Sequence, residues 1–367
     1  MKITDIQVIN YTQPKPPILR KRVKGEQEMS LVRIITDGGV EGYAMGRANG
    51  GTTGQVYGEF VTKTLKPYVV GQHPLDRERI WQTMLAQERV SYVPIFAVSL
   101  VDVALWDLAG KILEIPVYQL IGGYRDKIKS YASSAFLNTT DDYIEDARKA
   151  LERGIRGYKI HPFLEPDRDI ELCRALRKFV GNDVDLMLDV VNRYDRVTAL
   201  RIGRILENLN FLWYEEPLSH YDLQGYVDLC RDLDIPVVGA ETVAGSVYSS
   251  AAFIRAGAAD MLMCDTYWRG GITGMLKIAH LCEAAGLKIV SHHGASPLMN
   301  LANLHCLCSI SNADFVEVLV PEKEYEYGLK THLRVDEDGY LSAPQTPGLG
   351  AEIDWDYIKA HTTSEMT

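Results

Sequence analysis

The sequence predicts an α/β fold, a modified TIM barrel of the (β/α)7β type with a separate α+β capping domain. From about residue 129, short apolar runs alternate with amphipathic helical segments, a pattern typical of βαβ units and a parallel sheet. Seven of these runs end in ionisable residues at spacings of 24 to 28 residues, about the length of one strand, one helix and two loops. Residues 1–122 lack this rhythm and are expected to form the cap.

The cap is predicted to contain strands first and helices afterwards. Residues 1 to about 46 alternate polar and apolar side chains, and the Asp-Gly-Gly turn at 37–39 is a hairpin signal. Residues 54 to about 122 favour helices, with apolar residues at helical spacing at Val98, Val101, Leu105 and Leu108. We expect residues 1–125 to form the cap with its lid loops, residues 126–330 the barrel, and residues 331–367 a segment that returns to the cap.

Composition excludes several functional classes. A net charge of −10 argues against a nucleic-acid partner, which would need a basic surface. The six cysteines form no CxxC pair, so reduced thiols in a cytoplasmic protein are expected. The N-terminus lacks the apolar core of a signal peptide, and no apolar stretch approaches 18 residues, so no membrane span is predicted.

The ends of the apolar runs are the most informative positions. The C-terminal ends of parallel barrel strands lie on one face, where catalytic groups sit. A strand often ends in a polar residue because the chain leaves the core there, which can account for one or two positions but not for the whole set. With YASSAF near residue 131 as the first strand, the ionisable run ends are His161, Asp189, Glu215, Glu241, Asp265, His292 and Glu317.

Three carboxylates on adjacent strands predict a metal site. Asp189, Glu215 and Glu241 would repel one another without a cation, and oxygen ligands without Cys or His suit Mg²⁺ better than zinc. The alternative is that these carboxylates form ion pairs with local cations such as Lys159. Glu216 points to the opposite face of its strand and is expected to be structural.

Two groups of titratable residues predict acid–base chemistry. Asp265 lies one strand–helix unit before His292 and would orient its imidazole and raise its basicity, with His293 as the rival for that role. Lys159 and His161 are two residues apart on one strand and face the same way. A metal between two acid–base groups suits enolate formation, in which the metal neutralises charge as the proton next to a carboxylate leaves.

Several motifs resemble the mandelate racemase group of the enolase superfamily. These are VDVALWDLAGKILEIPVYQLIGG at 101–123, DVVN at 189–192, WYEEP at 213–217, VGAET at 238–242 and CDTYWRGGITG at 264–274. The resemblance implies that Asp189, Glu215 and Glu241 bind Mg²⁺ and that Asp265 and His292 form a catalytic pair. It also implies that Glu317 hydrogen-bonds the substrate carboxylate, for which it would be protonated or share a proton.

One position departs from the group's pattern. The second barrel strand commonly carries Lys-x-Lys, whereas this chain has Lys159-Ile160-His161. The departure favours an acid-sugar dehydratase, in which one of His161 and His292 takes the α-proton and the other protonates the leaving 3-hydroxyl. Lys159 would hold the carboxylate or lower the pKa of His161. The alternatives are a racemase or epimerase on the same scaffold and a non-catalytic metal-binding homologue.

The loop at 14–27 resembles the lid of this group. Its basic residues are expected either to meet a second carboxylate or sugar hydroxyls, or to be solvated; they are Lys15, Arg20, Lys21, Arg22 and Lys24. Arg47 and the glycine-rich segment 48–54 are expected to form a second part of the lid. The expected partners are a small acid-sugar substrate and further copies of the chain, as a dimer or an octamer.

Overall fold

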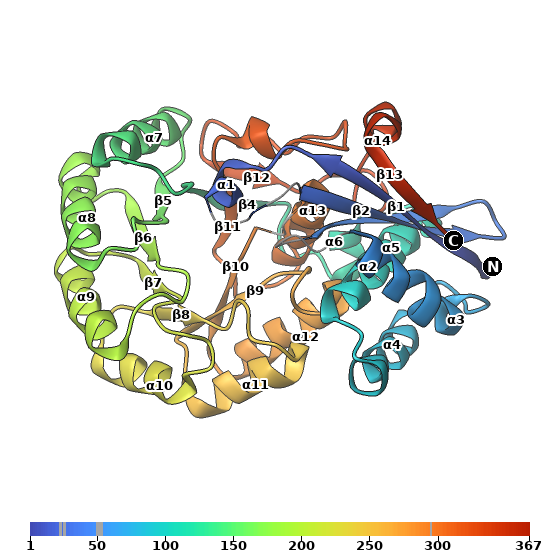
Figure 1. Cartoon of the computed structure of the whole chain (residues 1–367), viewed down its shortest axis with the longest axis horizontal. Helices are drawn as coiled ribbons and strands as arrows, with labels where there is room; N and C mark the ends of the chain where they lie inside the picture. The colour runs from blue at the N-terminus through green and yellow to red at the C-terminus, as the bar shows by residue number, and fades with distance from the viewer. Residues whose placement is uncertain (22–23, 25–26, 49–53, 294–295) are drawn as a thin grey trace.

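The computed structural model describes the chain except residues 22–23, 25–26, 49–53 and 294–295. A barrel-like sheet ringed by helices α7 to α11 fills one side of the molecule, and the cap fills the other (Figure 1). Both chain ends lie at the outer edge of the cap. This confirms the predicted fold class of a capped α/β barrel.

Parallel strands follow the predicted apolar runs. They are β4 (Lys127–Ser133), β5 (Gly157–Ile160), β6 (Asp185–Asp189), β7 (Trp213–Glu215), β8 (Val237–Gly239), β9 (Met261–Cys264), β10 (Lys288–Ser291) and β11 (Phe315–Leu319). The sheet order is β10-β9-β8-β7-β6-β5-β4-β11. A parallel bridge between Ile289 and Ala313 links β10 to the segment before β11 and nearly closes the barrel. The run ends from His161 to His292 therefore lie at or just beyond the ends of β5 to β10, at one rim, whereas Glu317 lies two residues before the end of β11.

A helix follows each of the first seven barrel strands. They are α7 (Thr140–Glu152), α8 (Pro166–Val180), α9 (Arg196–Asn208), α10 (Leu223–Asp232), α11 (Ser246–Ala256), α12 (Gly271–Ala284) and α13 (Pro297–Leu307). Thr139 and Asp142 form a reciprocal capping box at the start of α7. The φ angle is +85° at Gly154, +65° at Gly257 and +72° at Gly286. The predicted left-handed glycines therefore follow the ends of α7, α11 and α12. Within the described residues, no helix combines the length and the hydropathy needed to cross a bilayer.

The cap is an antiparallel sheet covered by helices. Strands β1 (Ile3–Gln13), β2 (Gln27–Thr36) and β3 (Glu41–Ala48) pair in sequence, with the predicted turn between the last two. The C-terminal strand β13 (Thr362–Met366) pairs with β1, so the end of the chain returns to the cap. The helical segments are α2 (Gly54–Glu59), a π-helix (Phe60–Leu65), α3 (Lys66–Val69), α4 (Arg77–Ser91), α5 (Ile95–Ile112) and α6 (Val117–Ile121).

The remaining short elements connect these two parts. Helix α1 (Pro17–Arg20) lies in the predicted lid loop, and a 3₁₀ helix (Glu322–Tyr325) follows β11. Strand β12 (Tyr340–Ser342) pairs with β4 in antiparallel fashion, and α14 (Trp355–His361) precedes β13. Helix α1 therefore belongs to a segment between two cap strands.

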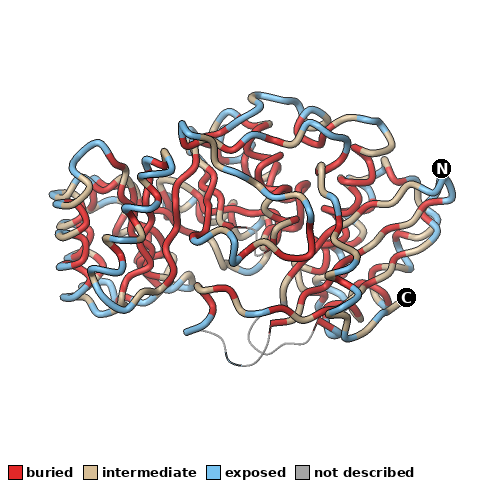
Figure 2. Tube along the Cα trace, turned by 90° about the horizontal axis from the view of Figure 1, so that it is seen from above, coloured by how far each residue is buried: buried red, intermediate tan, exposed pale blue. Residues whose placement is uncertain are grey.

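The barrel interior has its own apolar layer beneath the rim. It consists of Tyr131, Met187, Trp213, Val238, Met263 and Val290, all buried. In Figure 2 the buried trace runs through the barrel strands and the cap sheet, while exposed segments lie at the periphery. Trp213 belongs to this layer and donates its indole N–H to Glu215 at 2.8 Å. Trp213 and Glu215 therefore share the inner face of β7, as the two-residue period of a strand predicts.

A buried histidine makes the stability of this fold dependent on pH. His305 on α13 accepts the Tyr118 N–H at 3.1 Å and donates to the Leu349 carbonyl at 3.2 Å, joining three segments. Burial lowers the pKa of His305 from 6.5 to about 4, so the folded state holds it neutral. Stability from this group is fully present above about pH 6.5 and is lost as the pH falls towards 4.

We expect His305→Gln to have a flatter pH dependence of its unfolding free energy than the unaltered protein. The difference between the two curves should approach about 3 kcal/mol from pH 7 to pH 4. Urea unfolding at several pH values across this range measures it. Parallel curves for the two proteins would show that His305 does not carry this dependence.

Candidate active site

Three carboxylates gather at the rim of adjacent strands. Asp189 ends β6, Glu215 ends β7, and Glu241 follows β8 by two residues. One oxygen from each lies within 4.8 Å of the others, which is a group able to hold a metal ion. The donors are all carboxylate oxygens, so the set suits a hard divalent cation. The structure thus brings together the three residues that the sequence predicted as ligands.

Lys159 lies beneath this group as a buried cation. Its Nζ is 2.5 Å from Glu215 Oε1, 2.9 Å from Glu317 Oε1 and 3.7 Å from Asp189 Oδ2. Burial alone would lower the pKa of Lys159, but the carboxylates of Glu215 and Glu317 outweigh it and raise that pKa well above its usual value. Lys159 is fully buried, and its contacts are to protein carboxylates. Lys159 thus forms ion pairs with two of the three rim carboxylates, Asp189 and Glu215, which is one of the alternatives that the sequence allowed.

Glu317 lies against the Lys159 ammonium and is buried as well. Burial would raise the pKa of the Glu317 carboxyl, but Lys159 outweighs burial and lowers it to about 2. Its second oxygen accepts the backbone N–H of His293 at 2.5 Å. Both oxygens of Glu317 therefore act as acceptors of an ionised carboxylate. The ammonium of Lys159 stabilises the charged form of this carboxylate.

The charges of the site favour a bound cation. Asp189, Glu215 and Glu317 surround one lysine, and Glu241 adds a further acidic group at the same rim. Uncompensated buried carboxylates cost several kcal/mol each. One ammonium leaves most of this negative charge uncompensated, and a divalent cation between the three ligands would offset two further charges.

One ring nitrogen of His161 faces the carboxylate triad. Its Nδ1 lies 2.7 Å from the carbonyl oxygen of Ser134, and its Nε2 lies 3.0 Å from Asp189 Oδ2. A carbonyl oxygen can only accept, so Nδ1 carries a proton. The Ser134 hydroxyl accepts the backbone N–H of His161 at 3.0 Å. Ser134 therefore fixes both the backbone and the ring of His161, with Nε2 directed at the site.

His292 is the histidine that pairs with Asp265. Its Nδ1 lies 2.6 Å from Asp265 Oδ2, and its Nε2 lies 3.4 Å from Glu241 Oε1. Burial would lower the pKa of His292, but the Glu241 charge and the Asp265 hydrogen bond outweigh it and raise the pKa to about 9. The second Asp265 oxygen accepts the Trp268 N–H at 2.5 Å, which fixes the carboxylate.

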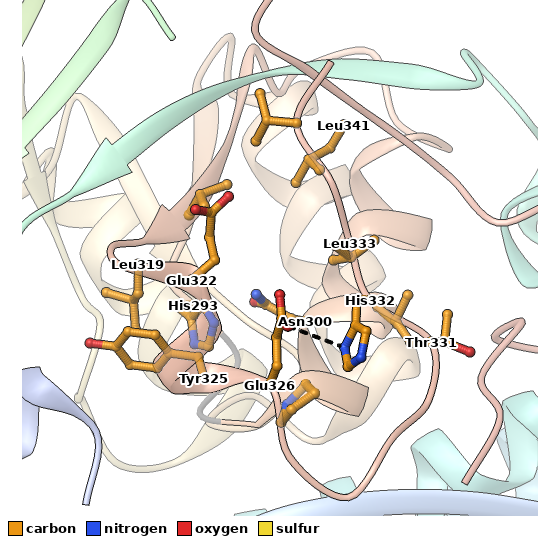
Figure 3. Close-up of a pocket in the computed structure, with 14 residues that line it drawn as sticks. His293, Asn300, Leu319, Glu322, Tyr325, Glu326, Thr331, His332, Leu333 and Leu341 are labelled. Carbon is orange, nitrogen blue, oxygen red and sulfur yellow. Dashed lines mark ion pairs between the residues drawn. The ribbon is translucent and has the colours of Figure 1, made fainter. Parts of the chain in front are cut away.

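His293 occupies a different environment. Its ring packs against Tyr325, with ring centroids 5.6 Å apart. Burial lowers the pKa of His293 to about 3, so the ring is neutral. His293 and Leu319 line both the active-site cavity and a smaller cavity of about 60 Å³, and the smaller cavity is drawn in Figure 3. His293 is therefore a wall residue, and the Asp265 contact belongs to His292.

The site opens into a cavity of about 330 Å³. The proposed acid–base histidines His161 and His292 line it, together with Asp189, Glu241 and Glu317. The lid helix α1 contributes Ile18 and Leu19. These two residues form a small apolar cluster with Leu319 and Tyr325, separate from the main core. The lid thus covers the cavity with apolar side chains. The many basic residues of this loop gave no indication of that contribution.

Two basic residues of the lid, Arg20 and Lys21, contact other parts of the protein. Arg20 forms an ion pair with Glu324, and Lys21 donates to the Leu137 carbonyl at 3.1 Å and to Asn138 Oδ1 at 2.7 Å. Both contacts hold the lid to the barrel rim. Lys24 is exposed, and Arg47 lines the cavity. Arg22 and residues 49–53 of the second expected lid segment lie outside the described residues.

Glu216 and Arg269, both buried, hold the backbone of Glu241. Glu216 points away from the triad, as expected, and its Oε1 accepts the Glu241 N–H at 2.9 Å. Arg269 is fully buried and donates to the Glu241 carbonyl at 2.9 Å. The adjacent glutamates thus have separate roles. Glu216 lies in the WYEEP motif and Arg269 in the CDTYWRGGITG motif, but no local pattern predicted a role for Arg269.

The sequence matches the models of two protein-family domains. The model of the mandelate racemase / muconate lactonizing enzyme N-terminal domain matches residues 3–122, and that of the enolase C-terminal domain-like family matches residues 142–357. The chain belongs to the mandelate racemase group of the enolase superfamily. The resemblance drawn from its motifs is therefore confirmed.

Relatives in this family catalyse different reactions. Arabinonate dehydratase of Saccharolobus solfataricus is 30% identical over 344 residues, covering 90% of this chain and 91% of that protein. N-succinyl-L-Arg/Lys racemase of Bacillus cereus is 28% identical over 372 residues, which cover 99% of this chain and 98% of that protein. The magnesium complex of D-glucarate dehydratase from Agrobacterium tumefaciens superposes with a TM-score of 0.88 at 34% identity, over 99% of this chain and 100% of that one.

Proposed function

We propose that this protein is a Mg²⁺-dependent acid-sugar dehydratase that converts a polyhydroxy acid into a 2-keto-3-deoxy acid. One observation carries the proposal. Two imidazoles, His161 and His292, each have Nδ1 held by an acceptor and direct Nε2 towards the carboxylate triad. This is the arrangement needed for one proton to leave and another to arrive around a substrate held at the metal.

Asp189, Glu215 and Glu241 would hold the Mg²⁺ ion, with Lys159 balancing the charge beneath them. When bound, the ion would neutralise the negative charge that develops on the substrate carboxylate as the α-proton leaves. The ionised Glu317 cannot donate to that carboxylate while Lys159 and the His293 N–H occupy its oxygens. We therefore assign Glu317 to the support of Lys159 and of the loop after β10.

The chain's own groups then move the two protons. Asp265 stabilises the positive charge on His292 when Nε2 takes a proton, and the Ser134 carbonyl holds His161 with Nε2 available. One imidazole removes the α-proton, and the other protonates the leaving 3-hydroxyl. The lid residues Ile18 and Leu19 exclude water from the cavity while this happens. Elimination is favoured over racemisation by the histidine at position 161 and supported by the dehydratases among the relatives.

A screen of acid sugars tests this function. We expect Mg²⁺ and one member of a panel of arabinonate, xylonate, galactonate, glucarate and talarate to give a 2-keto acid, detected as its semicarbazone. Inversion with deuterium uptake in D₂O and no keto acid would instead establish a racemase or epimerase. A melting temperature raised by Mg²⁺ with no reaction of any acid would favour a non-catalytic metal-binding protein.

A further inference from the structure

A buried asparagine connects the two halves of the Asp265–His292 pair. Asn303 lies on α13 and is fully buried. Its Oδ1 accepts the backbone N–H of Thr266 at 2.8 Å, and its Nδ2 donates to the backbone carbonyl of His292 at 2.9 Å. The donor and acceptor ends of the amide are thus both engaged, each with one of the two loops that carry the pair.

These contacts begin where the sheet ladder stops. The last paired residues of β9 and β10 are Cys264 and Ser291. Asp265 and His292 each come directly after that pair, so no ladder hydrogen bond sets the spacing of their backbones. The Asn303 amide spans the same gap from the helix side. It therefore supplies, by one side chain, a link that the sheet itself no longer provides.

We propose that Asn303 is a positioning residue that sets the distance and orientation between Asp265 and His292. The inference rests on the proposed role of His292 as an acid–base group. The Asp265–His292 hydrogen bond is 2.6 Å long and depends on the backbone at both ends. A shift of about 1 Å in a reacting group can cost about 100-fold in rate. Loss of the amide should therefore affect the chemical step more than substrate binding.

Asn312 provides a matched control, because its side-chain amide also binds backbone groups but lies away from Asp265 and His292. Asn312 donates its Nδ2 to the Ala279 carbonyl at 2.9 Å and to the Leu287 carbonyl at 3.2 Å. It lies by the start of β10, at the end of the barrel away from the pair. Asn312 also bridges two backbone segments, so its truncation costs comparable hydrogen bonds. It touches no residue assigned to the site.

The test compares Asn303→Ala with Asn312→Ala. We expect both to lower the melting temperature. Only Asn303→Ala should lower kcat, by about 10- to 100-fold, with KM and the Mg²⁺ dissociation constant changed by less than about twofold. The acid with the highest turnover in the panel serves as substrate, and calorimetry with Mg²⁺ alone gives the affinity. Equal kcat values for the two variants would overturn the inference.

A second variant and a spectroscopic readout cover the case in which Asn303→Ala does not fold. Asn303→Asp keeps the shape and the acceptor for Thr266 but replaces the donor to the His292 carbonyl. We expect the downfield proton NMR signal of His292 Nδ1–H, assigned by its loss in His292→Asn, to shift or broaden in this variant and to stay unchanged in Asn312→Ala. An unshifted signal would contradict the inference. Full turnover in His292→Asn would instead refute the proposed function, and the inference with it.

Discussion

His292→Asn and His161→Asn should each lower turnover by about 10²- to 10⁴-fold, the contribution of a positioned acid or base. Each substitution removes the only nitrogen that the ring directs into the site, because Nδ1 is already bound to Asp265 or to the Ser134 carbonyl. Steady-state kinetics with the best acid of the panel measures the loss. Exchange of the α-proton in D₂O then separates the roles. The variant that loses exchange lacks the base, and the one that keeps exchange without turnover lacks the acid.

His293→Asn is the control for these two variants. His293 adjoins His292 and lines the same cavity, yet its ring packs on Tyr325 and forms part of the wall. We expect a loss of less than about tenfold, because burial lowers the pKa of His293 to about 3 and so makes its ring a weak base for proton transfer. Full turnover in both His161→Asn and His292→Asn would refute the two-histidine mechanism.

Glu241→Gln should weaken Mg²⁺ binding at least about 100-fold. Replacement of outer partners of a metal ligand typically costs 10- to 100-fold, and Glu241 would be a ligand itself. Turnover should fall about 10³-fold or more at fixed Mg²⁺, since the charge formed on the substrate would lose its counter-ion. Calorimetry with Mg²⁺ measures the affinity without any substrate, and kinetics over a Mg²⁺ series measures whether excess metal restores turnover.

Glu216→Gln is the matched control because it makes the same change in the glutamate that lies behind the site. Burial and the nearby Glu241 charge raise the pKa of Glu216 to about 8, so an amide resembles its neutral form. The amide oxygen can still accept the Glu241 N–H. We expect Mg²⁺ affinity to change by less than about tenfold. An equal loss in both variants would argue against Glu241 as a specific ligand.

Much of the site could be predicted because barrel topology converts sequence spacing into spatial proximity. Asp189, Glu215 and Glu241 are about 26 residues apart, yet each ends or follows a parallel strand and they meet at one rim. The choice of Glu215 over Glu216 followed from the two-residue period of a strand, with Trp213 on the same face. These predictions needed only the two-residue period of a strand and the rule that parallel barrel strands end at one rim.

Other features depended on contacts that no spacing encodes. The ionised state of Glu317 follows from the position of the Lys159 ammonium, and the apolar contribution of the lid follows from how α1 turns Ile18 and Leu19 inward. Asn303 lies on α13, and no sequence pattern links that helix to Asp265 and His292. In each case the partner comes from a different element, so only the packing of those elements reveals the interaction.

The sequence by itself therefore determined the capped barrel, the ring of strand-end carboxylates and histidines, and the unusual histidine at position 161. Strand and helix periods are local properties of the chain, and the C-terminal ends of parallel barrel strands all lie on the same face. The tertiary structure alone decided which atoms of that ring meet. Hydrogen-bond partners, burial and charge balance act over a few ångströms and arise only after distant segments have packed together.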